Sequence, residues 1–210
     1  MKYIILILSC LLLSISTRAQ TTYEDLLRAA RDGDLKVVRN LVSSGMEPDT
    51  ADAAGNSLLM IAAREGREAV VRYLVDKKAR VRLQNGAGET AIMLASLKGY
   101  LDVVKFLRIR GSDINPAGWT PLHYCAWGGH VDVCRYLIEQ GAHVDARSPN
   151  GTSPLMMAVR GRHADIVDLL LAHAADPSIR NESRGSALAW AKRAGDTAIA
   201  ERLRRAGAKE

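Results

Sequence analysis

The chain repeats itself at a nearly fixed period, and this feature restricts its fold more than any other. Counting from Thr120 in the stretch TPLH, an equivalent Ser or Thr precedes an apolar run at successive steps of 33, 30, 33 and 33 residues. These markers are Ser57, Thr90, Thr120, Ser153 and Ser186, and one further step of 33 residues toward the N-terminus reaches Glu24. A unit of this size cannot bury its own apolar face, so the copies must stack on one another in a solenoid.

Four columns of the aligned units hold the same kind of residue in all six copies. Leu or Ile lies two residues after the marker, Ala or Cys five after, Val or Ile thirteen after, and Leu seventeen after. The apolar residues have helical spacing, and Ser or Thr at the marker is a favoured N-cap. A turn glycine separates two such helices, and a second glycine fits a left-handed C-cap. Each unit is therefore expected to be two antiparallel helices followed by an extended loop.

This pattern resembles the ankyrin repeat, whose unit of about 33 residues carries T-P-L-H-x-A. Thr120-Pro121-Leu122-His123 and Gly129-His130 carry the resemblance most fully, and it covers about residues 23–208. It implies an all-α repeat solenoid of stacked helix-turn-helix units with short β-hairpin loops. The expected units are residues 23–51, 52–84, 85–114, 115–147, 148–180 and 181–210.

The fourth unit departs from the period, because three residues are missing between Asn115 and Pro116. Its loop should be shorter than its neighbours and leave a notch. The histidine at position 123 is replaced elsewhere by Met60, Met93, Met156 and Ala189. In the family this histidine braces the loop by hydrogen bonds, so we expect the other loops to be looser.

Residues 1–19 differ in composition from the repeats. An apolar run from Ile4 to Ile15 covers about a dozen residues, whereas a membrane-spanning helix needs about 20. The run is typical of a secretory signal peptide, with cleavage expected between Ala19 and Gln20. A retained anchor is the alternative. We expect a mature chain over residues 20–210 that is periplasmic or secreted and not attached to a membrane.

Charge and motifs exclude several classes of function. The formal net charge is +6, and the basic residues are dispersed without the run of like charges that marks a nucleic-acid-binding arm. The chain has no P-loop, no G-x-S-x-G and no H-E-x-x-H motif. We therefore expect no cofactor, no metal, no nucleic acid partner and no catalytic residue.

The histidines of the fourth unit raise the question of a metal site. His123 and His130 are seven residues apart, which corresponds to roughly 10 Å along a helix. Ligands of one zinc ion lie about 2 Å from the metal. The two histidines therefore fit the repeat consensus better than a shared metal.

The cysteines of the same unit should face each other across its helix pair. Cys125 and Cys134 are equidistant from the turn and occupy columns that hold Ala and mostly Val elsewhere. Two alternatives stay open. They are buried free thiols acting as small apolar groups, or they form a disulfide within the repeat, which an oxidising compartment would favour. A catalytic cysteine is disfavoured, because an apolar setting raises the pKa of a thiol.

The variable columns indicate where a partner would bind. In the family the loop tips and the exposed end of the first helix line a concave groove that binds proteins. Carried over by column, the candidate residues are Arg64, Leu97, Lys98, Trp119, Trp127, Arg160 and Arg193. Trp and Arg are enriched at binding hot spots. For Trp119 a second interpretation stays open, in which its ring fills the notch.

The resemblance and these residues predict a monomeric, non-catalytic protein–protein interaction module outside the cytoplasm. Its partner would be a protein, such as an extracytoplasmic enzyme or a toxin. One alternative is a metal-binding or enzymatic protein centred on His123, Cys125, His130 and Cys134. Another is a structural spacer whose groove binds nothing.

Overall fold

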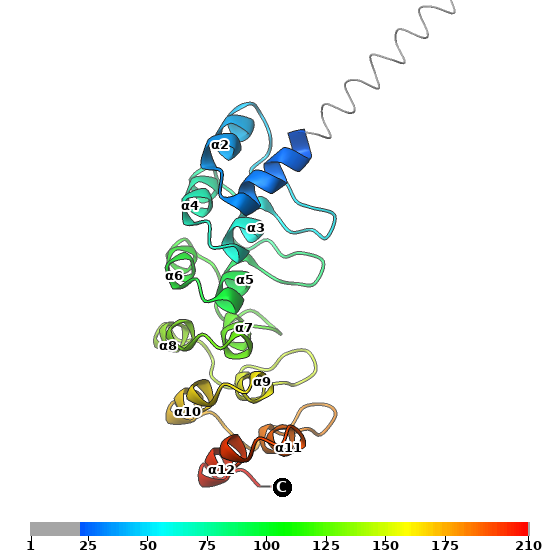
Figure 1. Ribbon diagram of the computed structural model, residues 1–210, viewed down its shortest axis with the longest axis vertical. Coiled ribbons are helices and arrows are strands. Elements are labelled where there is room, and N and C mark those ends of the chain that lie inside the picture. The colour runs from blue at the N-terminus through cyan, green and yellow to red at the C-terminus, as the bar shows by residue number, and fades with distance from the viewer. Residues whose placement is uncertain (1–21, 210) are drawn as a thin grey trace, which may run out of the picture.

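The computed structural model describes residues 22–209, which form six helix pairs stacked into one elongated array (Figure 1). A helical segment over residues 22–32 pairs with the first labelled helix. The labelled helices are α2 (Leu35–Ser43), α3 (Leu58–Arg64), α4 (Glu68–Asp76), α5 (Ala91–Lys98), α6 (Leu101–Ile109), α7 (Pro121–Gly128), α8 (Val131–Glu139), α9 (Pro154–Gly161), α10 (Ala164–Ala172), α11 (Ala187–Arg193) and α12 (Thr197–Arg205). The expected all-α repeat solenoid is confirmed.

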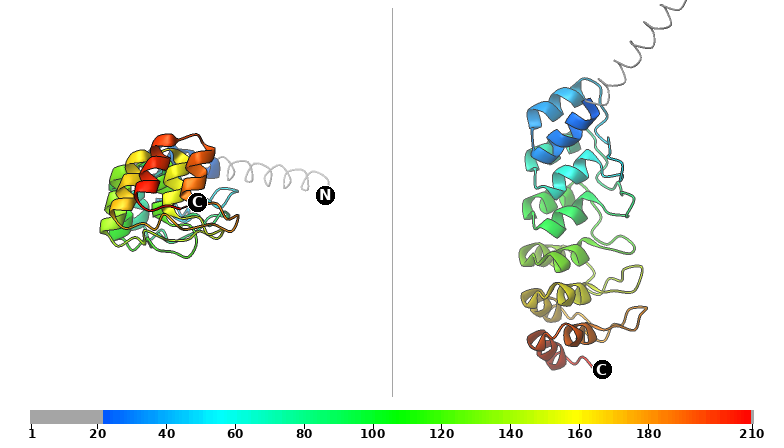
Figure 2. Two further views of the ribbon diagram at one scale, coloured as in Figure 1. Left: turned by 90° about the horizontal axis from the view of Figure 1, so that it is seen from below. Right: turned by 45° about the vertical axis from the view of Figure 1, so that its right-hand side comes forward.

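The helices form two rows, and the loops lie on one side of the stack. Helices α3, α5, α7, α9 and α11 make an inner row between the loops and the outer row of α4, α6, α8, α10 and α12 (Figures 1 and 2). The loops are extended but hold only isolated antiparallel bridges, Ala51 with Ser57 and Arg180 with Ser186, and no regular strand is seen over residues 22–209. In that part of the chain, the expected β-hairpins are therefore reduced to one bridge in each of these two loops, and the other loops have none.

The marker residues begin the inner helices as predicted. The side-chain oxygens of Ser57, Ser153 and Ser186 accept hydrogen bonds from the backbone N–H three residues later, at 3.1–3.4 Å. Each bond satisfies a donor that the first helical turn leaves without a partner. Between the outer helix and the loop, Lys78 and Ala174 have φ values of 70° and 62°, at positions where other units carry glycine. A side chain in this left-handed conformation costs about 1 kcal/mol.

The core is one continuous layer between the two rows and the loops. Leu59, Ile92, Leu122 and Leu155, which share one column, are at most 1% exposed. Burial of each such side chain contributes about 1.5–3 kcal/mol. Because every unit contributes to the same layer, no unit is expected to be stable without its neighbours.

Cations of the outer row stack on aromatic rings of the next repeat. The Arg72 guanidinium lies 4.5 Å from the Phe106 ring centroid, and the Lys105 ammonium lies 5.9 Å from that of Tyr136. Such contacts contribute about 0.5–1 kcal/mol each at exposed sites. These basic side chains therefore take part in packing the stack.

The fourth loop is shorter than its neighbours, as the deletion predicts (Figure 1). The loops of the second and third repeats are joined by a hydrogen bond from Gly86 N–H to the Ala54 carbonyl at 3.1 Å. A similar bond of 3.0 Å, from Glu182 N–H to the Asn150 carbonyl, joins the loops of the last two repeats.

The predicted signal peptide lies outside the described residues, so its cleavage stays a prediction. Over residues 22–209, no helix is both long and apolar enough to cross a membrane.

Candidate functional site

A cleft of about 290 Å³ opens over the middle of the inner row, between the third and fifth repeats. Its walls are mostly apolar and aromatic, with one cationic and one anionic side chain. The lining residues are Glu89, Leu97, Trp119, His123, Tyr124, Trp127, Met157 and Arg160. We call this the aromatic cleft.

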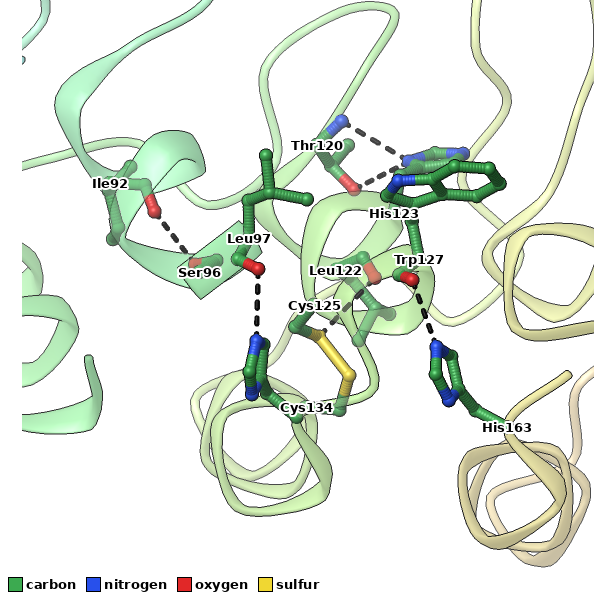
Figure 3. Close-up of a disulfide and its surroundings, with 11 residues drawn as sticks. Ile92, Ser96, Leu97, Thr120, Leu122, His123, Cys125, Trp127, Cys134 and His163 are labelled. Atoms are coloured by element: carbon green, nitrogen blue, oxygen red, sulfur yellow. Dashed lines mark hydrogen bonds between the residues drawn. A yellow bond between two sulfur atoms is a disulfide. The ribbon is translucent and has the colours of Figure 1, made fainter. Parts of the chain in front are cut away.

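Trp127 forms an exposed wall of the aromatic cleft, and its backbone carbonyl is hydrogen-bonded to the next repeat. It lies in the last turn of α7 and is 39% exposed. The Arg160 guanidinium lies 4.9 Å from its ring centroid, in a cation–π contact. The Trp127 carbonyl accepts a hydrogen bond of 3.0 Å from Nε2 of His163 in the next repeat (Figure 3). The indole is thus presented to solvent from a well-held position, with a cation beside it.

Trp119 also lines the aromatic cleft, and its ring contacts a buried histidine. Its ring contacts His123 edge to face, with centroids 5.2 Å apart and planes at 77°. Trp119 is partly buried against the core, as the notch-filling interpretation requires, and its remaining surface lines the cleft. The ring therefore has a packing role whether or not a partner contacts it.

His123 is fully buried, and both of its ring nitrogens are used. Nδ1 accepts a hydrogen bond of 3.2 Å from Thr120 N–H, and Nε2 donates one of 2.9 Å to the Thr152 carbonyl. Burial lowers the pKa of His123 from 6.5 to about 4, since the charged form would lose its hydration. His123 is therefore a neutral brace between the fourth and fifth repeats.

Tyr124 and Glu89 form the anionic edge of the aromatic cleft. The Tyr124 hydroxyl donates a hydrogen bond of 3.0 Å to Glu89 Oε1, and the Asn85 amide donates one of 2.8 Å to Oε2. Burial, together with the Glu89 charge, raises the pKa of Tyr124 well above its usual value. The carboxylate is held in place by neutral donors, and among residues 22–209 it forms no ion pair with a cation.

Cys125 and Cys134 form a disulfide behind the aromatic cleft, with their Cα atoms 5.6 Å apart (Figure 3). Of the two alternatives, the structure contains the disulfide and not the free thiols. Both residues are fully buried. The bond joins α7 to α8 and so fixes the helix that carries Trp127.

The arrangement does not favour a metal or catalytic site in the fourth repeat. His123 lies in the first turn of α7, whereas His130 lies after the end of α7 and is the N-cap residue of α8. Nε2 of His130 donates a hydrogen bond of 2.9 Å to the Leu97 carbonyl. The thiols are consumed in the disulfide, and both nitrogens of His123 are occupied. No group of three or more potential ligand side chains could hold a metal ion in the part of the chain that the structure describes.

The structure brings four of the seven candidate residues together. Leu97, Trp119, Trp127 and Arg160 line the aromatic cleft. Lys98 is exposed at the end of α5, beside Leu97 in sequence but not in the cleft lining.

Two candidate residues lie elsewhere. Arg64 forms an ion pair of 3.1 Å with Glu65 and does not line the aromatic cleft. Arg193 lines a second cleft of about 430 Å³ between the fifth and sixth repeats. We call it the arginine cleft, and its walls are Val159, Arg160, Asn181, Ser183, Trp190, Arg193 and Ala194. Arg160 is common to both clefts.

Four residues that line the aromatic cleft were not predicted as binding residues: Glu89, His123, Tyr124 and Met157. Tyr124 and Met157 share a column with Ile61 and Leu94, which are buried between repeats. Nothing in that column indicated that Tyr124, which is only partly buried, or Met157, which is 9% exposed, would line a cleft. Glu89 lies directly before Thr90, in the same loop-tip column as Trp119, and this register is the feature that could have identified it.

Comparison with known proteins agrees with the repeat architecture. Family profiles match residues 26–117 as ankyrin repeats in three copies, 117–149 as an ankyrin repeat, and 137–191 as ankyrin repeats in many copies. Together these matches span residues 26–191 without a gap. The chain belongs to the ankyrin repeat family. Ankyrin repeat domains act as protein–protein interaction modules, and proteins of the family are typically non-catalytic.

Two curated human proteins share short stretches with this ankyrin repeat chain. Ankyrin repeat domain-containing protein 39 is 46% identical over 37 residues, which are 18% of this chain and 20% of that protein. Protein phosphatase 1 regulatory subunit 27 is 51% identical over 39 residues, 17% of this chain and 25% of that protein. The chain thus spans a fifth to a quarter of the length of these relatives.

Proposed function

We propose that this ankyrin repeat chain is a non-catalytic module that acts outside the cytoplasm and binds a partner protein at the aromatic cleft. The observation that carries the proposal is the pair of Trp127 and Arg160. An indole that is 39% exposed is held at the mouth of a mostly apolar cleft, with a guanidinium 4.9 Å from its centroid. Trp and Arg next to a pocket are the typical composition of an interface hot spot.

The fold does not depend on the indole of Trp127. The Trp127 carbonyl accepts a hydrogen bond from His163, and the disulfide holds α7 against α8, so α7 keeps these contacts when the indole is removed. A partner that covered the ring would bury its remaining apolar surface, at roughly 25 cal/mol per Å². We therefore expect Trp127 to contribute more to binding than to folding.

The location outside the cytoplasm is supported by two features of the chain. The expected signal peptide over residues 1–19 would direct export. The disulfide between Cys125 and Cys134 would persist in an oxidising compartment, whereas cytosolic thiols are normally kept reduced.

Affinity capture from the native extracytoplasmic fraction tests the proposal. The full chain serves as bait, beside Trp127→Ala and a matched control, Ile109→Ala. Ile109 is 78% exposed at the end of α6, in the outer row, so the control removes more exposed apolar surface at a different face.

A protein retained by the wild type and by Ile109→Ala, but lost with Trp127→Ala, supports the proposal. We expect the loss of affinity to be about 2 kcal/mol or more, the range of a hot-spot residue. Thermal unfolding of all three proteins provides the folding control. Equal retention by all three would place the binding surface elsewhere, and no specific retention by any of them would favour a structural spacer.

A further inference from the structure

The arginine cleft carries positive charge that the rest of the protein does not neutralise. Neither Arg160 nor Arg193 forms an ion pair with any residue in the part of the chain described, and both are exposed. Of the 18 other arginines in residues 22–209, nine are paired with carboxylates. They are Arg28, Arg64, Arg72, Arg80, Arg110, Arg162, Arg202, Arg204 and Arg205. The arginine cleft therefore brings two guanidinium groups without an ion pair together on one surface.

The other polar groups of the arginine cleft can also donate hydrogen bonds. The Asn181 side-chain oxygen accepts a bond of 2.8 Å from Gly185 N–H, which leaves its amide N–H groups available. Ser183 is exposed on the same loop and adds a hydroxyl. The cleft thus combines cationic and neutral donors, which is the chemistry that binds a carboxylate.

No acidic side chain lines the arginine cleft among the residues that the structure describes. Asp196 lies 3.5 Å from Arg162, so its charge is already paired. Glu182 is exposed at the loop tip between Asn181 and Ser183, and its side chain is not part of the cleft wall. An acidic group from outside would therefore meet the guanidinium groups without displacing an internal partner.

Arg160 can serve both clefts at once. Its guanidinium carbon lies over the Trp127 ring, 4.9 Å from the ring centroid. A guanidinium can stack on an aromatic ring and still bind a carboxylate through the N–H groups in its plane. A carboxylate bound to Arg160 would therefore lie close to a partner side chain bound in the aromatic cleft.

We propose that the partner presents an acidic segment, with a large apolar side chain in the aromatic cleft and a carboxylate between Arg160 and Arg193 in the arginine cleft. This inference rests on the proposed function, since it names the chemistry of the partner at the same surface. Packed helices lie about 8–10 Å apart, and an extended chain advances about 3.3 Å per residue. The acidic and apolar residues should therefore be about three positions apart.

The charges also set the direction of the segment. Glu89 holds a negative charge at the far edge of the aromatic cleft, and it would repel a second carboxylate. The acid must lie toward Arg193 and away from Glu89. The net charge of +6 includes Lys2 and Arg18 of the expected signal peptide, and the +4 (6 − 2) of residues 20–210 would further attract an acidic partner over a basic one.

Selection from a random peptide display library against the full chain tests the inference even while the partner is unidentified. The wild type is compared with Trp127→Ala, with the double variant Arg160→Gln, Arg193→Gln, and with Arg135→Gln. Arg135 is exposed on the outer helix α8 and serves as the matched control for loss of an arginine. Circular dichroism confirms that each variant is folded.

We expect wild type and Arg135→Gln to enrich peptides with Asp or Glu about three positions from Trp, Phe, Leu or Met. The double variant should lose the acidic preference and keep the apolar one. Enrichment of apolar residues without acids would overturn the inference and leave the proposed function intact. Enrichment that is the same for Trp127→Ala and the wild type would instead contradict the proposed function itself.

A synthetic copy of the enriched peptide gives the quantitative test. Replacing its acid by the matching amide should weaken binding to the wild type at least about tenfold, because hydrogen bonds to charged groups are the stronger ones. The same replacement should have little effect on binding to the double variant. A tenfold loss that persists in the double variant would show that the acid is recognised elsewhere.

Discussion

The disulfide between Cys125 and Cys134 permits a prediction in which the cross-link can be separated from the packing of its two residues. The column of Cys125 holds Ala in the five other repeats, and that of Cys134 holds Val38, Val71, Val104 and Val167. The double variant Cys125→Ala, Cys134→Val therefore gives the fourth repeat the side chains that already pack in its neighbours. Its core volume changes little, so the packing penalty should be small.

The expected magnitude follows from the loop that the disulfide closes. The two cysteines are separated by nine residues in sequence. Loop-closure entropy for so short a loop corresponds to about 2.6 kcal/mol of stabilisation. For a chain of this size the same change would lower the unfolding midpoint by about 5–10 °C.

Equilibrium unfolding in urea, followed by far-UV circular dichroism, measures this difference. The oxidised wild type, the wild type under a thiol reductant, and the double variant are compared. We expect the reduced wild type and the variant to agree, both about 2.6 kcal/mol below the oxidised wild type. A variant as stable as the oxidised wild type would refute the reasoning, because the cross-link would then contribute nothing beyond its side chains.

Three further predictions concern His123, Ala174 and the N-terminus. His123→Met, which installs the residue of three other repeats, should remove part of the acid sensitivity of unfolding. Folding lowers the pKa of His123 from 6.5 to about 4, so the contribution of this residue to the free energy of unfolding is complete above about pH 6.5 and is lost as the pH falls toward 4. Between these two pH values, the free energy of unfolding should fall by about 3 kcal/mol more for the wild type than for the variant. Parallel pH profiles would contradict the assignment of a buried neutral imidazole. Ala174→Gly should stabilise the protein by about 1 kcal/mol in thermal unfolding, because Ala174 has a φ of 62°. Ala172→Gly, at the last residue of α10, should instead destabilise it, because glycine loses more conformational freedom in a helix. The intact mass of the native protein should correspond to a chain that begins at Gln20, and a mass that includes residues 1–19 would contradict cleavage of the signal peptide.

The sequence predicted the helices well because each repeat column has a single structural role. Leu122 and its equivalents are buried in every unit, and the serines at the markers cap their helices. Six copies of the same pattern made these assignments secure without reference to tertiary contacts. The same reasoning by column placed Leu97, Trp127 and Arg160 on one surface, where the structure has them.

The sequence could not predict features that depend on contacts between particular side chains. Arg64 lies in the same column as Arg160, but an adjacent Glu65 pairs with it. Tyr124 lies in a core column, yet it is only partly buried, donates to Glu89 and lines the cleft. The residues of a column predict the environment that most repeats give to that position. The side-chain partners of Arg64 and Tyr124, Glu65 and Glu89, do not follow from their columns.

The disulfide shows a similar limit. The register of the repeat placed Cys125 opposite Cys134, but bond formation requires Cα atoms closer than about 7 Å. The separation of 5.6 Å became known only from the packing of α7 against α8. Geometry at this scale is decided by the side chains around the helix pair and does not follow from the repeat period.

Site-specific photocrosslinking in the native cell would show whether the partner binds over the aromatic cleft. A photoreactive benzoylphenylalanine would replace Lys98, which is exposed beside Leu97, or Ile109, which is exposed in the outer row of the same repeat. We expect a crosslinked protein from position 98 that is lost when Trp127→Ala is added, and no specific product from position 109. A product from position 109 with none from position 98 would contradict binding over the aromatic cleft.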